Sequence, residues 1–244
     1  MGRHARLAAL TVRPGERTDD LVVADLGCGD GRTIRALLEL ETAPRLVHAL
    51  DHSAALPDDL LHDERVRSRI VDLEEALPFD DRTLDRVVSM NVIEALPDPG
   101  HFLRECHRVL RCGGWAVIGH TDFDTALFTS TDDALTRELV DRFVALVPGW
   151  AERADGFTGR KLPSLAEDSP FAVLEVHAWA DPHRRFDPGS LAWKIAQGML
   201  AAAADEPEVL SRALAWLDGV QALADEGRFL FAVTDVAVVL QRDA

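Results

Sequence analysis

Tyrosine is absent from the chain, and cysteine is scarce, with residues only at positions 28, 106 and 112. The lack of tyrosine removes one common proton-transfer group from any active site. The three cysteines form neither a C-x-x-C pair nor a zinc-binding spacing, and such a sparse, odd number is typical of a reducing cytoplasm. We therefore expect a cytoplasmic protein without a zinc site.

Long hydrophobic runs and an excess of positive charge are also missing. The first ten residues, MGRHARLAAL, are basic, but their apolar run is too short for a signal peptide. The most apolar later segment, FLFAVTDVAVVL, is interrupted by Asp235 and is too short to cross a bilayer. The net charge of −16 disfavours nucleic acid as the main partner, because phosphate binding requires a basic face. These features predict a soluble intracellular protein that binds neither membranes nor nucleic acid.

The first half of the chain alternates apolar runs with helical patterns, which indicates β-α-β units and a mostly parallel sheet. The total of 244 residues fits one α/β domain with an added subdomain. We expect five strands in this half, at 21–26, 45–50, 65–71, 84–90 and 114–120. Helices are expected between them, near 31–41, 53–61 and 99–110.

The pattern changes in the second half of the chain. An amphipathic helix is expected over 132–147, ended by Pro148 and Gly149. Two more strands are expected, at 171–180 and 229–242, separated by a helical insert over about 187–226. Its large apolar residues could line a pocket, but at helical spacing such residues more often form the core; they are Trp193, Met199 and Trp216.

The segment VVADLGCGDGRTI, residues 22–34, places glycines at three alternate positions after an apolar strand. Such glycines suggest a close approach to the backbone, because glycine otherwise loses much conformational entropy on folding. Taken alone, they would also fit a strand-to-helix turn without a ligand. Their spacing is one residue shorter than the dinucleotide-binding G-x-G-x-x-G, and Asp25 would be unfavourable beside a pyrophosphate. The acid instead favours a ligand that carries positive charge.

The stretch ADLGCGDG resembles the first motif of class I S-adenosylmethionine-dependent methyltransferases, whose cofactor carries an ammonium and a sulfonium. The similarity extends over 21–120. HALDHS places Asp51 at a strand end about 20 residues past the glycine loop. The stretch RIVDLEEALPFDDRTLDRVVSMNVIEALPDPGHFLRECHRVLRCGGWAVIG is similar to the core of the group that includes the ubiquinone- and menaquinone-biosynthesis enzymes. The resemblance implies a Rossmann-like α/β fold, a mostly parallel sheet flanked by helices, here with a helical insert between the last two strands.

The same resemblance implies S-adenosylmethionine as the cofactor and assigns its contacts. Asp51 would accept both ribose hydroxyls, Asp72 would face the adenine amino group, and Leu73 would pack near the ring. The implied cofactor-binding residues are Asp25, Gly27, Cys28, Gly29, Gly31, Asp51, His52, Asp72, Leu73 and Asn91. No metal ligand is implied.

Two positions depart from the pattern of the family. Ala95 stands where a histidine commonly follows the glutamate of the VLEH pattern. We expect this change to alter the cofactor or acceptor pocket. Cys112 replaces the usual proline before the paired glycines, which we interpret as a turn variation.

The stretch GHTDFDT, residues 119–125, follows the fifth strand at the carboxyl end of the sheet, where open α/β proteins bind ligands. If it stays extended, His120, Asp122 and Asp124 face the same side. His120 is the candidate catalytic residue, because histidine can act as a general base near neutral pH. An equally weighted alternative is that His120 only hydrogen-bonds the cofactor or a neighbouring loop. A metal site formed by the three residues is disfavoured.

We therefore predict methyl transfer from S-adenosylmethionine to a small-molecule acceptor, in a composition that suggests secondary metabolism. One domain is expected over 1–244, in which 1–122 binds the cofactor and 123–244 forms the acceptor side, with 187–226 as a helical cap. One alternative is an enzyme of the same fold that uses the cofactor without methyl transfer, in a pericyclic or decarboxylating reaction. Another is a non-catalytic partner that regulates an enzyme. The sequence leaves open the acceptor atom and whether the chain is a monomer or a homodimer.

Overall fold

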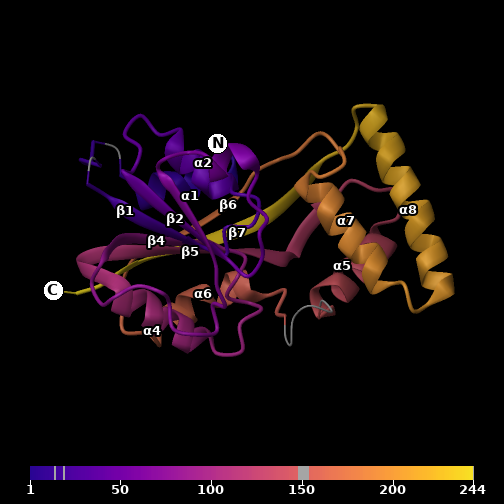
Figure 1. Cartoon of the computed structure of the whole chain (residues 1–244). Coiled ribbons are helices and arrows are strands. Elements are labelled where there is room, and N and C mark those ends of the chain that lie inside the picture. Colours follow the sequence, from indigo (N-terminus) through magenta and orange to yellow (C-terminus); the bar gives the residue numbers. More distant parts are fainter. Residues whose placement is uncertain (14, 19, 148–153, 244) are drawn as a thin grey trace. The chain divides into compact units, whose positions relative to one another are not determined.

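The computed structural model describes residues 1–13, 15–18, 20–147 and 154–243 (Figure 1). Within these ranges, strands form a sheet in the order β3-β2-β1-β4-β5-β7-β6. The strands are β1 (Val22–Leu26), β2 (Leu46–Asp51), β3 (Val66–Ile70), β4 (Leu84–Met90), β5 (Leu110–Phe128), β6 (Ala172–Ala180) and β7 (Phe231–Gln241). The predicted strands are all present, and β5 extends further at both ends than the sequence indicated.

The first five strands are parallel. β1 pairs with β2 and β4, β2 with β3, and β4 with β5. β7 runs antiparallel to β5, because the Gly113 N–H donates to the Arg242 carbonyl at one end and the Thr129 N–H to the Leu230 carbonyl at the other. The carboxyl ends of β1, β2 and β4 therefore lie at one edge of the sheet, where the glycine loop begins.

The helices are α1 (Arg3–Thr11), α2 (Arg32–Leu38), α3 (Asp58–Leu61), α4 (Pro99–Val109), α5 (Asp133–Ala145), α6 (Thr158–Glu167), α7 (Leu191–Ala202) and α8 (Pro207–Asp225). The expected helices are present, with α2 and α3 shorter than predicted. The expected stop signal Pro148-Gly149 lies outside the described residues. Helices α1 and α6 were not predicted, and Pro163 inside α6 explains part of this, because proline disfavours a helix interior.

The chain divides into two compact units. Unit 1 comprises Met1–His120, Arg160–Ala178 and Val236–Ala244, and unit 2 comprises Thr121–Gly159 and Trp179–Asp235. The later segments of unit 1 return to it from beyond residue 122, so these units do not coincide with the expected division at that residue. The single-domain organisation with a cofactor side and an acceptor side stays a prediction.

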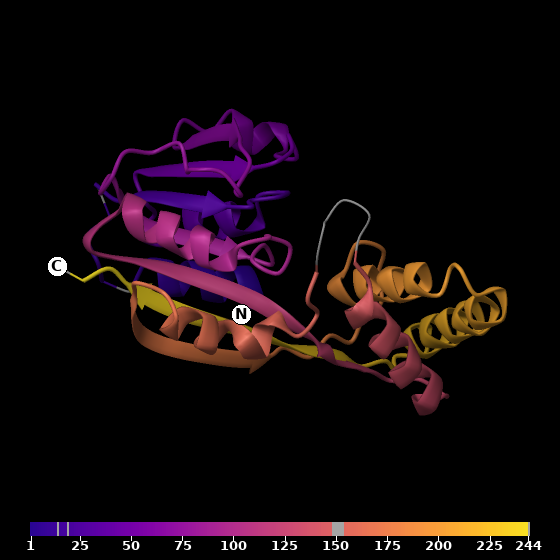
Figure 2. The ribbon, with the colours of Figure 1, turned by 90° about the horizontal axis from the view of Figure 1, so that it is seen from below.

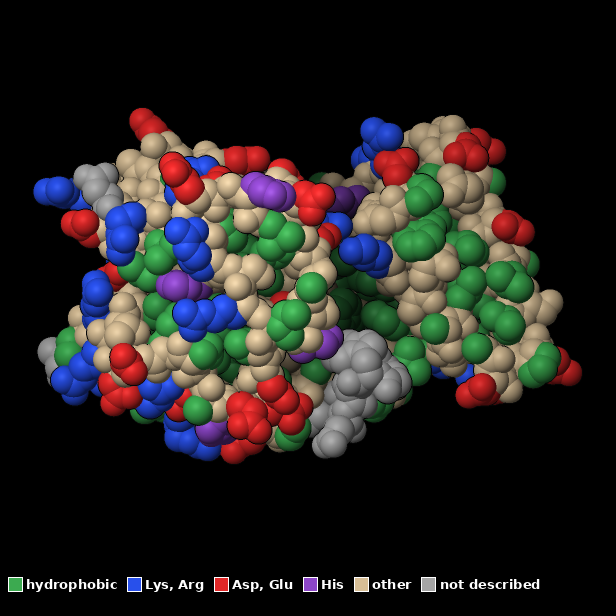
Figure 3. Space-filling model, viewed as in Figure 1, with side chains coloured by type: hydrophobic (Ala, Val, Ile, Leu, Met, Phe, Trp, Pro, Cys, Tyr) green, Lys and Arg blue, Asp and Glu red, His purple; other side chains and the backbone are tan. Residues whose placement is uncertain are grey.

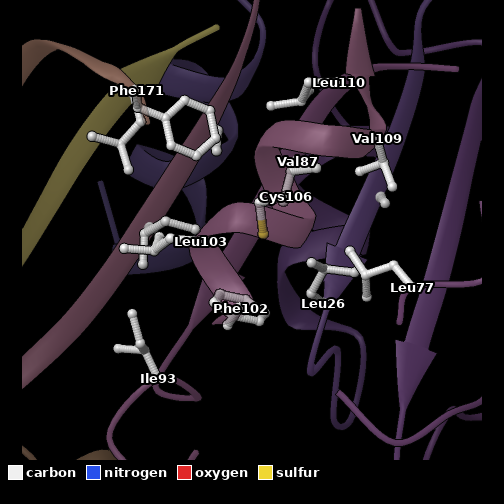
Figure 4. Packing of buried hydrophobic residues seen from close by; sticks show 14 of the residues in the cluster. Leu26, Leu77, Val87, Ile93, Phe102, Leu103, Cys106, Val109, Leu110 and Phe171 are labelled. Atoms are coloured by element: carbon white, nitrogen blue, oxygen red, sulfur yellow. The ribbon is translucent and has the colours of Figure 1, made fainter. Parts of the chain in front are cut away.

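In unit 1, α1 and α2 lie on one face of the sheet, and α4 and α6 on the other (Figures 1 and 2). Asp98 is the N-cap of helix α4, and its side chain accepts a hydrogen bond from the His101 N–H. Its apolar face packs against strand residues such as Leu26 and Val87 (Figure 4). The buried face of α4 consists of Phe102, Leu103, Cys106 and Val109. This packing holds the strands whose carboxyl ends carry the candidate site.

Unit 2 has its own hydrophobic cluster, formed by residues of β5, α5, α7, α8 and β7. Met199 and Trp216 are buried in it, and the Trp216 indole N–H donates to the Thr136 hydroxyl at 2.8 Å. Trp193 is only half-buried and packs against the cluster. Two of the three large insert residues thus belong to the core. In the described parts of the chain, no helix has both the length and the apolar character needed to cross a membrane.

Candidate cofactor site

The glycine loop joins β1 to α2 and is tied to the end of β2. The N–H groups of Gly27 and Cys28 both donate to the Leu50 carbonyl, at 2.8 and 3.0 Å, and the Gly31 N–H donates to the Cys28 carbonyl at 2.9 Å. All three glycines have positive φ angles, of +75°, +50° and +76° along the chain. Glycine adopts this left-handed region at little cost, which explains its use at these positions.

The three glycines differ in what surrounds them. A Cβ atom at Gly27 would lie 2.2 Å from a methyl group of Val92, and one at Gly31 would lie 2.3 Å from a methyl group of Leu60. A Cβ atom at Gly29 would meet no heavy atom within 4 Å among the described residues. Tight packing therefore accounts for Gly27 and Gly31. Open space remains beside Gly29, as a close ligand approach requires.

Asp51 is a buried residue at the end of β2 and holds the tip of this loop. Its Oδ2 accepts a hydrogen bond from the Gly29 N–H at 2.8 Å. Its Oδ1 accepts from both the N–H and the hydroxyl of Ser53, at 3.1 and 3.0 Å, and lies 3.0 Å from Nδ1 of the exposed His52. A carboxylate has about four lone-pair directions, so this one retains capacity for a further donor.

Asp25 is almost fully buried near the end of β1, with 2% of its surface exposed. Its Oδ2 has no hydrogen-bond partner among the described residues. Burial, and then the charge of Asp51, raises the pKa of Asp25 to about 8. Burial also raises the pKa of the Cys28 thiol to about 12, with further contributions from the two acids. A buried polar oxygen without a partner is rare in proteins, so Asp25 points to a ligand that would supply a donor.

The remaining predicted cofactor residues follow β3 and β4. Asp72 is exposed, and its carboxylate accepts a hydrogen bond from the Glu74 N–H at 2.9 Å. Leu73 is buried in the core of unit 1. Asn91 has a positive φ of +56°, which asparagine tolerates better than most residues, and its N–H donates to the Gly119 carbonyl at 3.0 Å. The structure thus joins Asp25, the loop and Asp51 closely, while Asp72 and Asn91 lie at the ends of nearby strands.

His120 is fully buried, and its Nε2 lies 2.9 Å from Oε2 of Glu94. Glu94, the glutamate that precedes Ala95, was not among the predicted site residues. The side chain of Glu94 is 13% exposed. A carboxylate at this distance favours the neutral tautomer of the imidazole that carries its proton on Nε2. The pair therefore resembles the arrangement in which an acid orients a histidine base.

The stretch after His120 stays extended as part of β5, as the sequence analysis assumed. Asp122 is buried, whereas Asp124 forms an ion pair with Arg137 of α5 at 2.6 Å. Among the described residues, no group of three or more histidine, cysteine, aspartate or glutamate residues is placed to hold a metal ion.

Comparisons with known proteins identify the family. Residues 24–118 match the family described as "Methyltransferase domain". An uncharacterized methyltransferase of Mycobacterium sp. (strain KMS) is 29% identical over 242 residues, which is 96% of this chain and 80% of that protein. Residues 24–118 therefore form a methyltransferase domain of the class I S-adenosylmethionine-dependent type.

Other comparisons agree with this methyltransferase assignment. The human mitochondrial ubiquinone biosynthesis O-methyltransferase is 29% identical over 170 residues, or 67% of this chain and 45% of that protein. The YcgJ protein of Bacillus subtilis superposes with a TM-score of 0.63 at 16% identity, covering 98% of this chain and 99% of that structure, which shows a common fold. The chain spans about half the length of several curated relatives that it matches. The predicted family, its Rossmann-like fold and S-adenosylmethionine as the family's cofactor are confirmed.

Proposed function

We propose that this methyltransferase moves a methyl group from S-adenosylmethionine to a small-molecule acceptor. The observation that carries the proposal is the pair of buried acids at the glycine loop, Asp25 and Asp51, beside the open space at Gly29. Two carboxylates suit a ligand with a cationic end and a diol, and they would repel a pyrophosphate. The cofactor supplies a methyl group already activated on sulfur. The protein therefore has to bind the cofactor, orient the acceptor and exclude water.

The residues of the site divide these binding tasks between them. Asp51 would accept from the ribose diol through Oδ2, whose donor in the structure is the Gly29 N–H, whereas Ser53 and His52 already contact Oδ1. Asp25 would face the cationic amino acid end of the cofactor, because its Oδ2 lacks a donor. Gly27, Cys28, Gly31 and His52 would form the surrounding loop wall. Asp72 and Leu73 would border the adenine, and Asn91 the cofactor or the acceptor.

His120 is the proposed general base for an acceptor that carries a proton. With Nε2 directed at Glu94, a neutral imidazole keeps its Nε2 proton and leaves Nδ1 as the basic nitrogen. Glu94 would then act as a positioning residue for His120. Such assistance contributes about 10²–10⁴-fold to a rate. The alternative role, in which His120 only binds the cofactor or a loop, predicts loss of cofactor affinity when the histidine is removed.

Unit 2 is the proposed acceptor side, with the helical insert over 187–226 as its cover. In support, half-buried aromatic side chains pack on its core, and the rings of Phe123 and Phe143 meet edge to face at 5.4 Å. Phe157 and Trp193 are also half-buried there. Such a surface favours an apolar or aromatic small molecule, and the net charge of −16 disfavours nucleic acid. A role in secondary metabolism, a cytoplasmic location and a monomeric or homodimeric state remain parts of this proposal.

The test is formation of S-adenosylhomocysteine with a panel of acceptors that includes phenols, amines and carbon acids. We expect one acceptor class to give S-adenosylhomocysteine and methylated product in equal amounts. A product that forms while S-adenosylmethionine is retained would instead favour the non-methylating alternative. A regulatory role would be favoured if the chain binds the cofactor, gives no product with any acceptor of the panel and stimulates a partner enzyme. Binding of NAD in place of S-adenosylhomocysteine would contradict the proposal at its base.

A further inference from the structure

The unpartnered oxygen of Asp25 has a consequence for how the cofactor binds. In the parallel sheet, Asp25 is aligned with Ala49 of β2 and Val88 of β4, neither of which has a polar side chain. Asp51, by contrast, has hydrogen-bond donors on both oxygens. Unlike Asp51, Asp25 therefore loses its hydration on burial without gaining hydrogen-bond donors to both of its oxygens.

The electrostatic surroundings of Asp25 disfavour its charged form. Among the described residues, the titratable groups that interact with it are Asp51, at the end of β2, and the Cys28 thiol in the loop. Neither supplies positive charge. The pKa of about 8 means that Asp25 carries a proton at neutral pH in the cofactor-free protein. A protonated Asp25 avoids two adjacent buried carboxylates, which would repel each other.

We propose that binding of the cofactor's ammonium expels the proton from Asp25, so that cofactor binding is coupled to the release of one proton. The carboxylic acid of Asp25 loses its proton to solvent, the ammonium of the cofactor keeps all of its protons, and the resulting carboxylate accepts a hydrogen bond from that ammonium. A charge-assisted pair of this kind is stronger than a neutral hydrogen bond. This inference rests on the proposed function, because it requires the cofactor to bind at the glycine loop.

The coupling gives cofactor affinity a defined dependence on pH. Below about pH 8, Asp25 must give up a proton for binding, so the affinity falls about tenfold for each unit by which the pH is lowered. The dependence levels off as the pH approaches 8, because Asp25 is then ionised before the cofactor arrives. The methyltransferase would thus bind its cofactor more weakly in an acidified environment.

The test is calorimetric titration of the full chain with S-adenosylhomocysteine, which has the ammonium but no sulfonium. Titrations at about pH 6.5, where an α-amino group is still protonated, are repeated in buffers with different ionisation enthalpies. The slope of the observed enthalpy against the buffer enthalpy gives the number of protons released. We expect about one proton for the wild-type chain. The affinity measured from about pH 6 to 7.5 should rise about tenfold per unit.

Two matched controls separate the ammonium and Asp25 from other sources of protons. The ligand control is 5′-methylthioadenosine, which has the nucleoside but no amino acid, and its binding should release no proton. The variant Asp25→Asn should bind S-adenosylhomocysteine more weakly and without proton release. Asp30→Asn changes an acid of the same loop that is exposed and paired with Arg32, so proton release should persist. If Asp25→Asn fails to fold or to bind, two measurements on the wild-type chain still test the proposal. They are the comparison of S-adenosylhomocysteine with 5′-methylthioadenosine and the dependence of affinity on pH.

The outcomes separate this inference from the proposed function. Binding of S-adenosylhomocysteine without proton release and with an affinity independent of pH would overturn the inference and leave the proposed function intact. Equal proton release with 5′-methylthioadenosine, or from Asp25→Asn, would also overturn it, because another group would then be the source. Absence of any binding would overturn the proposed function, and the inference with it.

Discussion

The buried acids of the two units differ in their hydrogen-bond partners. In unit 1, Asp25 is buried near the glycine loop with an oxygen that lacks a partner among the described residues. In unit 2, Asp235 is also buried, but its carboxylate accepts a hydrogen bond from the Thr121 hydroxyl at 2.7 Å. The hydrogen bond of Asp235 is made within the fold, whereas the oxygen of Asp25 that lacks a donor leaves a position for a donor from a ligand.

The surfaces of the two units differ as well. Figure 3 shows arginine, lysine, aspartate and glutamate side chains scattered over unit 1 and hydrophobic side chains gathered over the α7 and α8 region of unit 2. Leu214 of α8 is 47% exposed. On the face that Figure 3 shows, the α7 and α8 region is thus the more apolar part. The experiments below test this comparison, beginning with the largest expected effect.

The glycine loop should give the largest effect. Gly29→Val should abolish cofactor binding and keep the fold, because its side chain would enter the open space beside the loop. The positive φ angle adds strain of about 1–3 kcal/mol. Gly27→Val should lose both binding and stability, since its Cβ would lie 2.2 Å from Val92. Calorimetry with S-adenosylhomocysteine and circular dichroism on the same samples measure the two properties. Normal binding by folded Gly29→Val would mean that the loop serves only as a turn.

The glycine loop also shows how far the sequence was informative. Its spacing, the acids Asp25 and Asp51, and the alternation of strands and helices predicted the fold of unit 1, because each signal is local in the chain. Glu94 was missed because it lies in a turn after β4 and its role depends on contact with His120, which lies 26 positions away on β5. In unit 2, periodicity predicted the helices but could not separate core residues from pocket residues. Trp193 and Trp216 are the same residue type, and only the packing shows that Trp216 is buried and Trp193 half-buried.

Glu94→Gln should give the next largest effect. A glutamine amide can donate to Nε2 and thereby place the histidine proton on Nδ1, which removes the basic nitrogen at that position. Turnover should fall about 10²–10⁴-fold, while affinity for S-adenosylhomocysteine stays unchanged. NMR of nitrogen-labelled protein, with His120→Ala for assignment, should show the change of tautomer directly. An unchanged tautomer together with lost cofactor affinity would make the pair a binding element.

Trp216→Ala tests the structural role of unit 2. It removes a buried indole and its hydrogen bond to Thr136, so the free energy of unfolding should fall by about 3–5 kcal/mol. Trp193→Ala is the matched variant, because Trp193 is half-buried, and it should lower stability less and raise the KM for the acceptor. Urea unfolding and steady-state kinetics provide the measurements. Cofactor affinity should be unaffected in both variants, and its loss would break the division of tasks between the units.

Asp51→Ala should weaken cofactor binding more moderately. It removes a charged acceptor for the ribose hydroxyls, and each such hydrogen bond contributes about 1.5–3 kcal/mol. It also removes the hydrogen bond that Asp51 accepts from the Gly29 N–H at 2.8 Å. Asp51→Asn, which keeps an acceptor oxygen for Gly29, separates the loop contact from the charge. Calorimetry that finds unchanged affinity in Asp51→Ala would remove this residue from the site.

The last test returns to the buried acids, now in the cofactor-free protein. The pKa of Asp25 is about 8 in the folded chain, against an ordinary value of 3.8. Between these values the folded protein holds a proton that the unfolded chain has lost, so the free energy of unfolding falls as the pH rises from about 4 to about 8. Asp25→Asn removes this loss, because asparagine does not titrate.

We therefore expect cofactor-free Asp25→Asn to melt at a higher temperature than the wild type at about pH 8, with the difference vanishing near pH 4. Each 1 kcal/mol of added stability corresponds to about 2–4 °C in a protein of this size. Asp235→Asn is the matched control from unit 2 and should bring no gain, because Asp235 already has the Thr121 hydroxyl as its donor. Thermal melts of the three proteins across this pH range provide the measurement. Parallel pH profiles for wild type and Asp25→Asn would show that Asp25 is ionised at neutral pH, and the contrast between the two buried acids would then be lost.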